Sequence, residues 1–297
     1  TKNQILALPI ASESGVSKRW INAGDIQNKG IELLITGTPI ETKDWRWDLS
    51  FNLTRNRNKI VSLFEGVEKY QLVGGGTDTQ AWATVGGAYG DIYTSYAYTL
   101  NDKGEKLLNA DGSYPRSNKS EKIGSLQPKF LWGANTSVSW KGITLNAVID
   151  ARFGGDIFSA SYYYGMNSGN IKSSLAGRDT QYGGLPRTLA DGRTVNDGVI
   201  PEGVFMPGTE IKGVDVSGMS YQAAYEQGLV EPLSAYKYYD NVYSWSGGIR
   251  SEGIHKCSWV ALRELSVHWQ LPKKWVNKAY IQNASVGLMA RNLGFLY

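Results

Sequence analysis

The sequence of 297 residues predicts an all-β fold, a portion of an antiparallel transmembrane β-barrel with long extracellular loops. Three observations predict it: apolar and polar residues alternate along several segments, short and long connections alternate between those segments, and tryptophans gather near the short connections. A strand with strict alternation separates two environments. The loop lengths and the tryptophans indicate that one of these environments is lipid.

The segment 44–54 alternates without an error and predicts a strand. We expect its apolar side chains to face lipid, namely Trp45, Trp47, Leu49, Phe51 and Leu53. The residues between them should face a wet lumen or a plug. Before it, segment 30–37 predicts a weaker strand, with Ile31, Leu33 and Ile35 on one face and Leu34 as an exception.

A hairpin is the strongest structural prediction. Strands at 130–140 and 143–153 each alternate, and the alternation changes parity across Lys141 and Gly142, as a tight two-residue turn requires. Two further strands are expected at 259–271 and 284–293. In the first, Arg263 interrupts one apolar set, which consists of Trp259, Ala261, Leu265, Val267, Trp269 and Leu271. No long amphipathic helix is expected, only a short helical turn within 272–282.

The connections predict how the strands are oriented. Residues 37–43, 141–142 and 272–282 are short connections, and residues 55–127 and 156–256 are long ones. In an antiparallel meander this order places every short turn at one end and every long loop at the other, as in outer-membrane barrels. Ten alternating residues rise about 33 Å, or roughly 24 Å when tilted, which matches the apolar band of such barrels.

Two groups of side chains follow from this topology. Four tryptophans near the short turns should form a girdle at the membrane interface: Trp45, Trp47, Trp140 and Trp269. Six polar residues on the other parity should face the lumen: Arg46, Asp48, Asn52, Asn146, Asp150 and Arg152. Because several of these are charged, we expect a wide, wet lumen or a polar plug.

The composition argues against several other classes of protein. With 31 basic and 27 acidic residues and no block of like charge, nucleic-acid binding is not expected. One cysteine permits no intrachain disulfide, and with two histidines it is a poor metal-ligand set, so no metal, cofactor or catalytic residue is expected. No stretch is long and apolar enough for a transmembrane helix.

Several blocks resemble the SusC/RagA-type TonB-dependent transporters. They include "NAGDIQNKGIELLITGTPI", "WRWDLSFNLTRNRNKI", "GAYGDIYTSYAYTLNDKGEKLLNADGSYP", "IGSLQPKFLWGANTSVSWKGITLNAVIDARFGGDIFS", "SWVALRELSVHWQLPKKW" and "ASVGLMARNLGFLY". Their order and spacing carry the resemblance over most of the chain from Asn22 onward. The resemblance implies a barrel of 22 strands, of which residues 1–297 would be a C-terminal part, with the plug, the early strands and the final strand outside it.

The resemblance also implies a function. Such a protein would import a bulky nutrient, a glycan or a peptide, across the outer membrane of a Gram-negative bacterium. Its partners would be a SusD-like surface lipoprotein, the TonB complex acting through the plug, and membrane lipid; no enzymatic activity is implied.

Aromatic residues in the two long loops are the candidate substrate contacts, because aromatic faces stack on the apolar faces of sugar rings. They are Tyr89, Tyr93, Tyr162, Tyr163, Tyr164, Tyr238, Tyr239 and Trp245, with Asp240 as an acceptor for hydroxyl groups. The same residues could instead pack the loops or contact the lipoprotein. A secreted carbohydrate-binding β-sandwich and a glycosidase with paired carboxylates stay open as alternatives.

Overall fold

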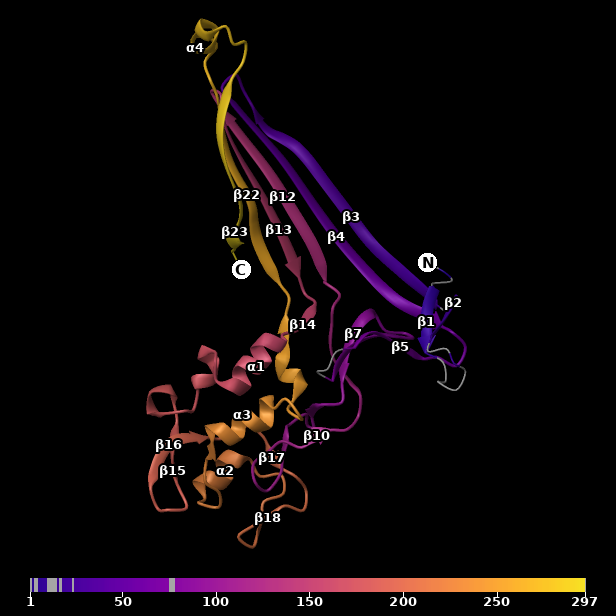
Figure 1. The fold of residues 1–297 in the computed structure, drawn as a ribbon, viewed down its shortest axis with the longest axis vertical. Helices are drawn as coiled ribbons and strands as arrows, with labels where there is room; N and C mark the ends of the chain where they lie inside the picture. The colour runs from indigo at the N-terminus through magenta and orange to yellow at the C-terminus, as the bar shows by residue number, and fades with distance from the viewer. Residues whose placement is uncertain are drawn as a thin grey trace.

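One antiparallel sheet of six strands runs along most of the molecule (Figure 1). The computed structural model describes residues 2, 5–9, 15, 18–22, 24–74 and 78–296. Each strand pairs with its neighbours in the chain, so the sheet is a meander with open edges, and no closed barrel forms within the described residues. The strands are β3 (Gly24–Glu41), β4 (Trp45–Leu63), β12 (Phe130–Trp140), β13 (Ile143–Phe153), β22 (Trp259–Gln270) and β23 (Ser285–Phe295).

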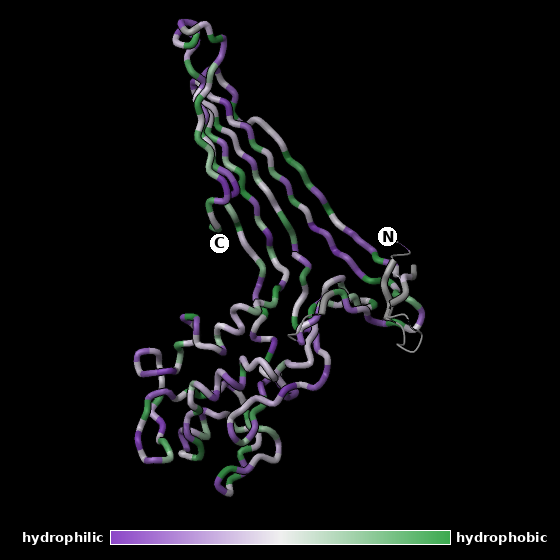
Figure 2. The backbone as a smooth tube through the Cα atoms, in the orientation of Figure 1, coloured by the Kyte–Doolittle hydropathy of each residue, from purple (hydrophilic) through white to green (hydrophobic). Residues whose placement is uncertain are grey.

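The register places the apolar residues of neighbouring strands on one face. One row across the sheet consists of Leu33, Leu53, Trp132, Ala151 and Val260. Rows of the other parity lie on the opposite face and are mostly polar, such as Thr36, Ser50, Asn135, Val148, Glu264 and Arg291. Figure 2 shows the same alternation of polar and apolar residues along the strands. The prediction that alternation separates two faces is therefore confirmed.

Strands β3 and β4 are longer than the sequence indicated. The predicted segments are 30–37 and 44–54, whereas the ladder extends from the turn to the pair of Gly24 and Leu63. In the extension, residues 55–59 are all polar, so alternation cannot mark them as a strand. Backbone hydrogen bonding between the two strands, which does not depend on side-chain polarity, continues the hairpin.

A β-bulge in β22 changes the face of the sheet on which the side chains before it lie, so one predicted face needs correction. The register shifts between Leu262 and Glu264, which leaves Arg263 as an extra residue. Ala261 consequently pairs with Asp150 on the polar face, while Leu265 pairs with Ala147 on the apolar face. The predicted set that joined Trp259 and Ala261 to Leu265, Val267 and Trp269 was therefore wrong, because alternation across a bulge changes parity.

The connections are divided between the two ends of the sheet, as predicted. The short ones are 42–44, 141–142 and 271–284, and the long ones are 64–129 and 154–258. Lys141 and Gly142 both have positive φ, at 44° and 88°, as a two-residue hairpin turn requires. The expected helical turn after β22 is present as α4 (Lys273–Val276) and the 3-10 helix η5 (Asn277–Ala279). No described helix is long and apolar enough to cross a membrane.

The two long connections pack into one body, which we call the loop unit (residues 64–129 and 154–258), at the far end of the sheet from α4 (Figure 1). The first contributes a four-stranded sheet in the order β11-β7-β6-β5, and the parallel pair of β9 with β17 joins it to the second. They share a core that includes Leu108, Tyr163, Phe205, Tyr221 and Ile249. A hairpin of β1 (Ile5–Pro9) and β2 (Lys18–Asn22) lies near the distal end of β3 and β4.

The remaining strands of the loop unit are short. Those of the first connection are β5 (Lys69–Gly74), β6 (Thr79–Thr84), β7 (Tyr89–Thr94), β8 (Ala97–Tyr98), β9 (Leu107–Leu108), β10 (Arg116–Ser117) and β11 (Glu121–Ser125). Those of the second are β14 (Asp156–Phe158), β15 (Leu185–Thr188), β16 (Thr194–Val199), β17 (Val204–Phe205), β18 (Glu210–Ile211), β19 (Val214–Asp215), β20 (Leu233–Ser234) and β21 (Ile254–Lys256).

Helices occupy both tyrosine-rich segments, although the sequence pattern predicts no helix there. Serine side chains cap α1 (Ala160–Ser168) and α3 (Ala235–Tyr243) by accepting from backbone amides, Ser159 from Tyr162 and Ser234 from Lys237. In α3 the buried residues Ala235, Tyr239, Val242 and Tyr243 recur at helical spacing, a signal that could have revealed it. The other helices are α2 (Tyr221–Glu226), η2 (Lys172–Leu175), η3 (Thr180–Tyr182) and η4 (Arg250–Gly253).

Candidate functional site

The tryptophans predicted to lie near the short turns do so. Trp45 pairs with Trp140 across β4 and β12, and their ring centroids are 5.6 Å apart. Trp269 pairs with Ile143 in the same region, and Trp47 lies further along β4, where its indole N–H donates to Thr136 Oγ1 at 2.8 Å. Trp45, Trp140 and Trp269 are each more than a third exposed. Their position at a membrane interface stays a prediction.

The six residues predicted to face the lumen all lie on the polar face of the sheet. At the short-turn end, the Arg46 guanidinium donates to Asp48 at 2.8 Å and to Glu41 at 2.7 Å, and the Thr38 hydroxyl donates to the same Asp48. Asn52 lies against Gly133. A Cβ atom added at Gly133 would lie 3.1 Å from the side-chain amide nitrogen of Asn52. The glycine therefore leaves the space that the Asn52 side chain occupies.

The polar network continues toward the loop unit. Asn146 donates to Ser266 Oγ at 3.2 Å, and Asp150 accepts from Arg263, the bulged residue, at 3.0 Å. Arg152 donates to the carbonyl of Leu126 at 2.6 Å, which joins the end of β13 to the first long connection. A hollow of about 530 Å³ lies over β3, β4, β12 and β13, and its lining contains apolar residues such as Val148 together with the polar residues Thr36, Asp48, Ser50, Asn135, Ser137 and Asn146.

Two of the predicted substrate contacts are buried in the core of the loop unit. Tyr163 has no exposed surface, and its hydroxyl donates to the carbonyl of Val242 at 3.0 Å. Burial raises its pKa to about 12. Tyr239 is 5% exposed, and its hydroxyl donates to the carbonyl of Ala176 at 2.9 Å. This is a correction for Tyr163, whose ring packs the core and offers no free face to a substrate; Tyr239 also packs the core but borders a hollow that Tyr238 and Tyr182 line.

Other predicted contacts meet at the surface. The ring of Tyr164 in α1 lies tilted against that of Trp245, which follows α3, with ring centroids 4.0 Å apart and planes 34° apart. Trp245 remains 60% exposed. Tyr162 is half-buried and packs edge-on against His255, with centroids 4.5 Å apart.

The remaining candidates lie apart from that pair. Tyr238 is half-buried, and burial raises its pKa to about 12, while Asp240 is exposed on α3. Tyr89 and Tyr93 lie on β7; Tyr89 is exposed, and the Lys69 ammonium lies 5.2 Å from the Tyr93 ring centroid. Substrate contact by all of these exposed or half-buried residues stays a prediction.

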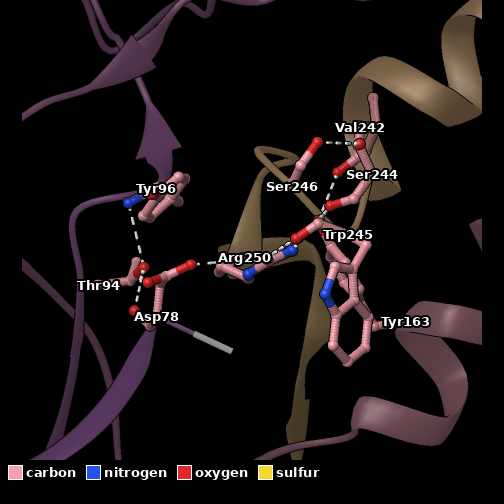
Figure 3. A network of polar contacts seen from close by, with 9 residues as sticks. All are labelled: Asp78, Thr94, Tyr96, Tyr163, Val242, Ser244, Trp245, Ser246 and Arg250. Carbon is pink, nitrogen blue, oxygen red and sulfur yellow. Dashed lines mark hydrogen bonds and ion pairs between the residues drawn. The ribbon is translucent and has the colours of Figure 1, made fainter. Parts of the chain in front are cut away.

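No pattern in the sequence marks Arg250, which lies among the candidate contacts (Figure 3). Its guanidinium has no exposed surface and donates to the carbonyls of Ser244 and Trp245 at 2.9 and 2.6 Å. It also pairs with the Asp78 carboxylate at 3.7 Å, and its backbone N–H donates to the carbonyl of Tyr96 at 2.7 Å. Arg250 thus connects the second long connection to the first.

Asp156 joins three segments where the loop unit meets the sheet. Its carboxylate accepts from the backbone amide of Ser125 at 2.9 Å and from the Lys256 ammonium at 2.7 Å. Burial opposes ionisation of Asp156, but these hydrogen bonds and nearby cations outweigh it and lower its pKa. Among the described residues, no group of three or more His, Cys, Asp or Glu side chains is arranged to hold a metal ion.

We expect Asp156→Asn to destabilise this junction by about 1 kcal/mol, because the mostly buried carboxylate loses its charge-assisted hydrogen bond from the exposed Lys256 ammonium, which solvent screens. Since the pKa is lower in the folded state, the carboxylate stabilises the fold above pH ~4 and this contribution is lost as pH falls through the folded pKa. Amide hydrogen exchange at β11 and β14, corrected for intrinsic rates, measures both effects. The exposed Asp240→Asn is the matched control, and equal protection in both variants would contradict the expectation.

The known proteins with similar sequences are TonB-dependent receptors. No family model matches the chain. The TonB-dependent receptor P3 of Formosa agariphila is 29% identical over 181 residues, which cover 54% of this chain and 18% of the receptor. The TonB-dependent receptor SusC of Bacteroides thetaiotaomicron is 33% identical over 94 residues, which cover 30% of this chain and 9% of SusC. The chain thus spans less than a fifth of the length of these curated relatives.

Solved structures match the whole fold. The RagAB peptide transporter aligns with a TM-score of 0.60 at 21% identity, covering 99% of this chain and 28% of that one. The RagAB peptide importer in its closed-closed state aligns with a TM-score of 0.61 at 20% identity, covering 100% and 29%. TonB-dependent receptors are outer-membrane transporters of Gram-negative bacteria and not enzymes. In sequence and in strand arrangement, the chain matches one part of the SusC/RagA-type TonB-dependent receptor family.

Proposed function

We propose that this chain is a C-terminal part of the barrel of a TonB-dependent transporter, which imports a bulky nutrient across the outer membrane. The observation that carries the proposal is the continuous separation of an apolar and a polar face over six paired strands. The apolar face would contact lipid, with the tryptophan girdle at the interface near the short turns. The polar face would line the lumen or contact a plug.

The loop unit supports the proposal that a surface lipoprotein is a partner of this protein. It is formed by the two long connections, and in outer-membrane barrels the long loops lie on the extracellular side. A SusD-like surface lipoprotein would cover this end, as the resemblance to the family implies, and the TonB complex would act from the periplasmic side through the plug.

The substrate we propose first is a glycan, and a peptide is the second candidate. The exposed Trp245 and its neighbour Tyr164 favour a glycan, because flat aromatic surfaces suit the apolar faces of sugar rings. The peptide candidate comes from the RagAB structures, which are described as a peptide transporter.

The alternative of a secreted β-sandwich receives little support. A sandwich packs a second sheet against the apolar face of the first. In the described part of this chain, apolar side chains of that face stay exposed, as Leu33, Ile35 and Leu288 do at 44%, 55% and 82%. A glycosidase is not supported either, because the family is one of transporters.

Uptake by living cells tests the proposal. Cells that carry the complete receptor and its lipoprotein should accumulate fluorescently labelled oligosaccharide only while TonB is present and the inner membrane is energised. The same cells without TonB are the control. Uptake that is equal without TonB, or no uptake of either oligosaccharides or peptides, would contradict import, whereas TonB-dependent uptake of peptides alone would select the second substrate.

A further inference from the structure

The connection between β22 and β23, residues 271–284, is the longest of the three short turns and forms a small structured unit. Val276 is buried, and its carbonyl accepts from the Ile281 amide at 3.1 Å. At the base of the connection, the Leu271 amide donates to the Ala284 carbonyl at 2.9 Å. The unit therefore has its own hydrogen bonds and its own buried residue, and it presents the remaining side chains in a defined arrangement.

Aromatic side chains continue the apolar face of the sheet onto this unit. The Trp275 ring packs edge-on against Trp269 of β22, with ring centroids 5.8 Å apart, and Trp275 remains 55% exposed. Trp269 belongs to the apolar face, where it pairs with Ile143 of β13 and Val286 of β23. The apolar surface of the sheet thus extends beyond the end of β22 onto α4.

Tyr280 occupies a backbone conformation that tyrosine rarely adopts. Its φ is 58°, in the left-handed region where glycine or asparagine usually ends a helix. The side chain is 99% exposed, so its contacts with the described part of the chain do little to offset the strain. The next residue, Ile281, is also exposed. A membrane surface would cover both side chains, because aromatic residues are favoured at the interface between lipid and water.

Positive charge gathers at the same end of the sheet. The turns 42–44, 141–142 and 271–284 contain five lysines and one aspartate, namely Lys43, Lys141, Lys273, Lys274, Lys278 and Asp44. Their surplus of four positive charges equals the surplus of 31 basic over 27 acidic residues in the whole chain, so the rest of the chain is neutral overall. Backbone hydrogen bonds join the turns, from the Lys141 amide to the Asp44 carbonyl at 3.1 Å and from the Gln270 amide to the Gly142 carbonyl at 2.7 Å.

The three lysines of the connection itself, Lys273, Lys274 and Lys278, are exposed. No acidic residue occurs within 271–284, and in the part of the chain that the structure describes none of the three ammonium groups forms an ion pair. Unpaired ammonium groups beside exposed aromatic rings match an anionic phospholipid, whose charged headgroup lies just outside the layer that interfacial aromatic rings occupy. An acidic protein would match the charge alone, without the continuity with the apolar face.

We infer that residues 271–284 form a docking surface for anionic phospholipids of the periplasmic leaflet. The lysines bind the headgroups, while Trp275 and Tyr280 lie at the boundary between headgroups and acyl chains. The inference rests on the proposed function, which places the loop unit outside the cell. Because α4 lies at the opposite end of the sheet from the loop unit (Figure 1), it would then lie on the periplasmic side.

Photocrosslinking of the full-length receptor in phosphatidylcholine vesicles tests the docking surface. The probes are phosphatidylglycerol and phosphatidylcholine, each with the same photoreactive group at the start of one acyl chain, and peptide mapping locates the crosslinks. We expect phosphatidylglycerol to crosslink residues 271–284 in preference to phosphatidylcholine. At low salt the preference should fall by up to about fivefold for each lysine removed, the effect of one basic residue near an anionic surface. Excess glycerol phosphate, the headgroup without acyl chains, should not compete.

The test variant combines Lys273→Gln, Lys274→Gln and Lys278→Gln, and its two crosslinking yields should become nearly equal. The matched control combines Lys103→Gln, Lys119→Gln and Lys172→Gln. It removes three exposed lysines from the loop unit and should leave the preference unchanged. Heat-modifiability of each variant shows whether the receptor remains folded.

A second pair of variants tests the aromatic part of the surface. Tyr280→Ala should lower the crosslinking of residues 271–284 by both lipids, because a ring that reaches the acyl chains binds without regard to headgroup charge. Its matched control is Tyr236→Ala, which removes a 77% exposed ring from α3 in the loop unit and should change neither yield.

Four outcomes overturn the inference: both lipids crosslink residues 271–284 equally in the unchanged receptor, the triple variant keeps the preference, the control triple loses it as well, or glycerol phosphate competes and thus reveals a site for free anions. Absence of lipid crosslinks at this turn in outer-membrane preparations, because a periplasmic protein covers it, also overturns the inference. These failures are distinguishable from failure of the proposed function. TonB-dependent uptake by a receptor whose turn shows no preference among lipids would leave the transporter in place and remove the docking surface.

Discussion

Replacing Leu49 with arginine should prevent most of the receptor from assembling in the outer membrane. Leu49 lies midway along the apolar stretch of β4, where it pairs with Gly37 of β3 and Thr136 of β12. If this face contacts lipid, the guanidinium would lie near the centre of the bilayer. An arginine there costs about 2–4 kcal/mol in outer-membrane barrels. The fraction of heat-modifiable, folded receptor in outer-membrane preparations measures the loss.

Ser50→Arg is the matched control, one residue further along the same strand. Ser50 lies on the polar face and pairs with Thr36 and Asn135. An arginine there would face water or the plug, so assembly should stay close to that of the unchanged receptor. Denaturant titration of both variants in lipid vesicles gives the difference in unfolding free energy. Equal losses for the two variants, or a larger loss for Ser50→Arg, would show that the faces are assigned incorrectly.

Replacing Tyr163 with alanine should destabilise the loop unit by about 3–5 kcal/mol, the usual cost of removing a large buried aromatic side chain. Tyr163 has no exposed surface and packs against Phe158, Tyr164 and Tyr243, with centroid distances of 5.3 to 5.7 Å. Its removal leaves a cavity, and the Val242 carbonyl keeps only the hydrogen bond from the Ile249 amide. Hydrogen exchange of α1 and α3 in the full-length receptor measures the loss, while the strands of the sheet should keep their protection.

Tyr236→Ala is the control for this experiment too, since it removes an exposed tyrosine from α3 and should change protection little. Tyr163→Phe separates the ring from its hydroxyl and should cost about 1 kcal/mol, the value of one hydrogen bond. If Tyr163→Ala weakened ligand binding while hydrogen exchange stayed unchanged, Tyr163 would be a ligand contact and its assignment to the core would be mistaken.

Alternation in the sequence predicted the strands because the side-chain period of a strand is two residues, whatever the strand pairs with. It therefore found the segments that begin at Phe130 and Ile143 with the observed bounds, and it found the start but not the end of the strand that includes Leu49. It failed at Arg263, because one inserted residue changes which face the following side chains occupy. It also missed α1 and α3, because nine-residue helices depend mostly on tertiary packing.

The candidate contacts were less predictable than the strands. A run such as Tyr162, Tyr163 and Tyr164 looks uniform in sequence, yet in a helix neighbouring side chains point about 100° apart. One of these rings packs the core, one lies edge-on against His255, and one lies tilted against Trp245. In the sequence, nothing distinguishes Arg250 from other loop residues. Its role depends on the carbonyl groups that its guanidinium contacts in the folded chain.

The sequence by itself determined the two faces of the sheet and the division of short and long connections between its ends, because both depend only on local periodicity and on chain order. The tertiary structure alone decided which aromatic side chains are buried and which stay available to a ligand. That choice depends on contacts between residues far apart in the chain, such as the Tyr163 hydroxyl with the Val242 carbonyl and Arg250 with Asp78. Such pairings form only when the two long connections pack together.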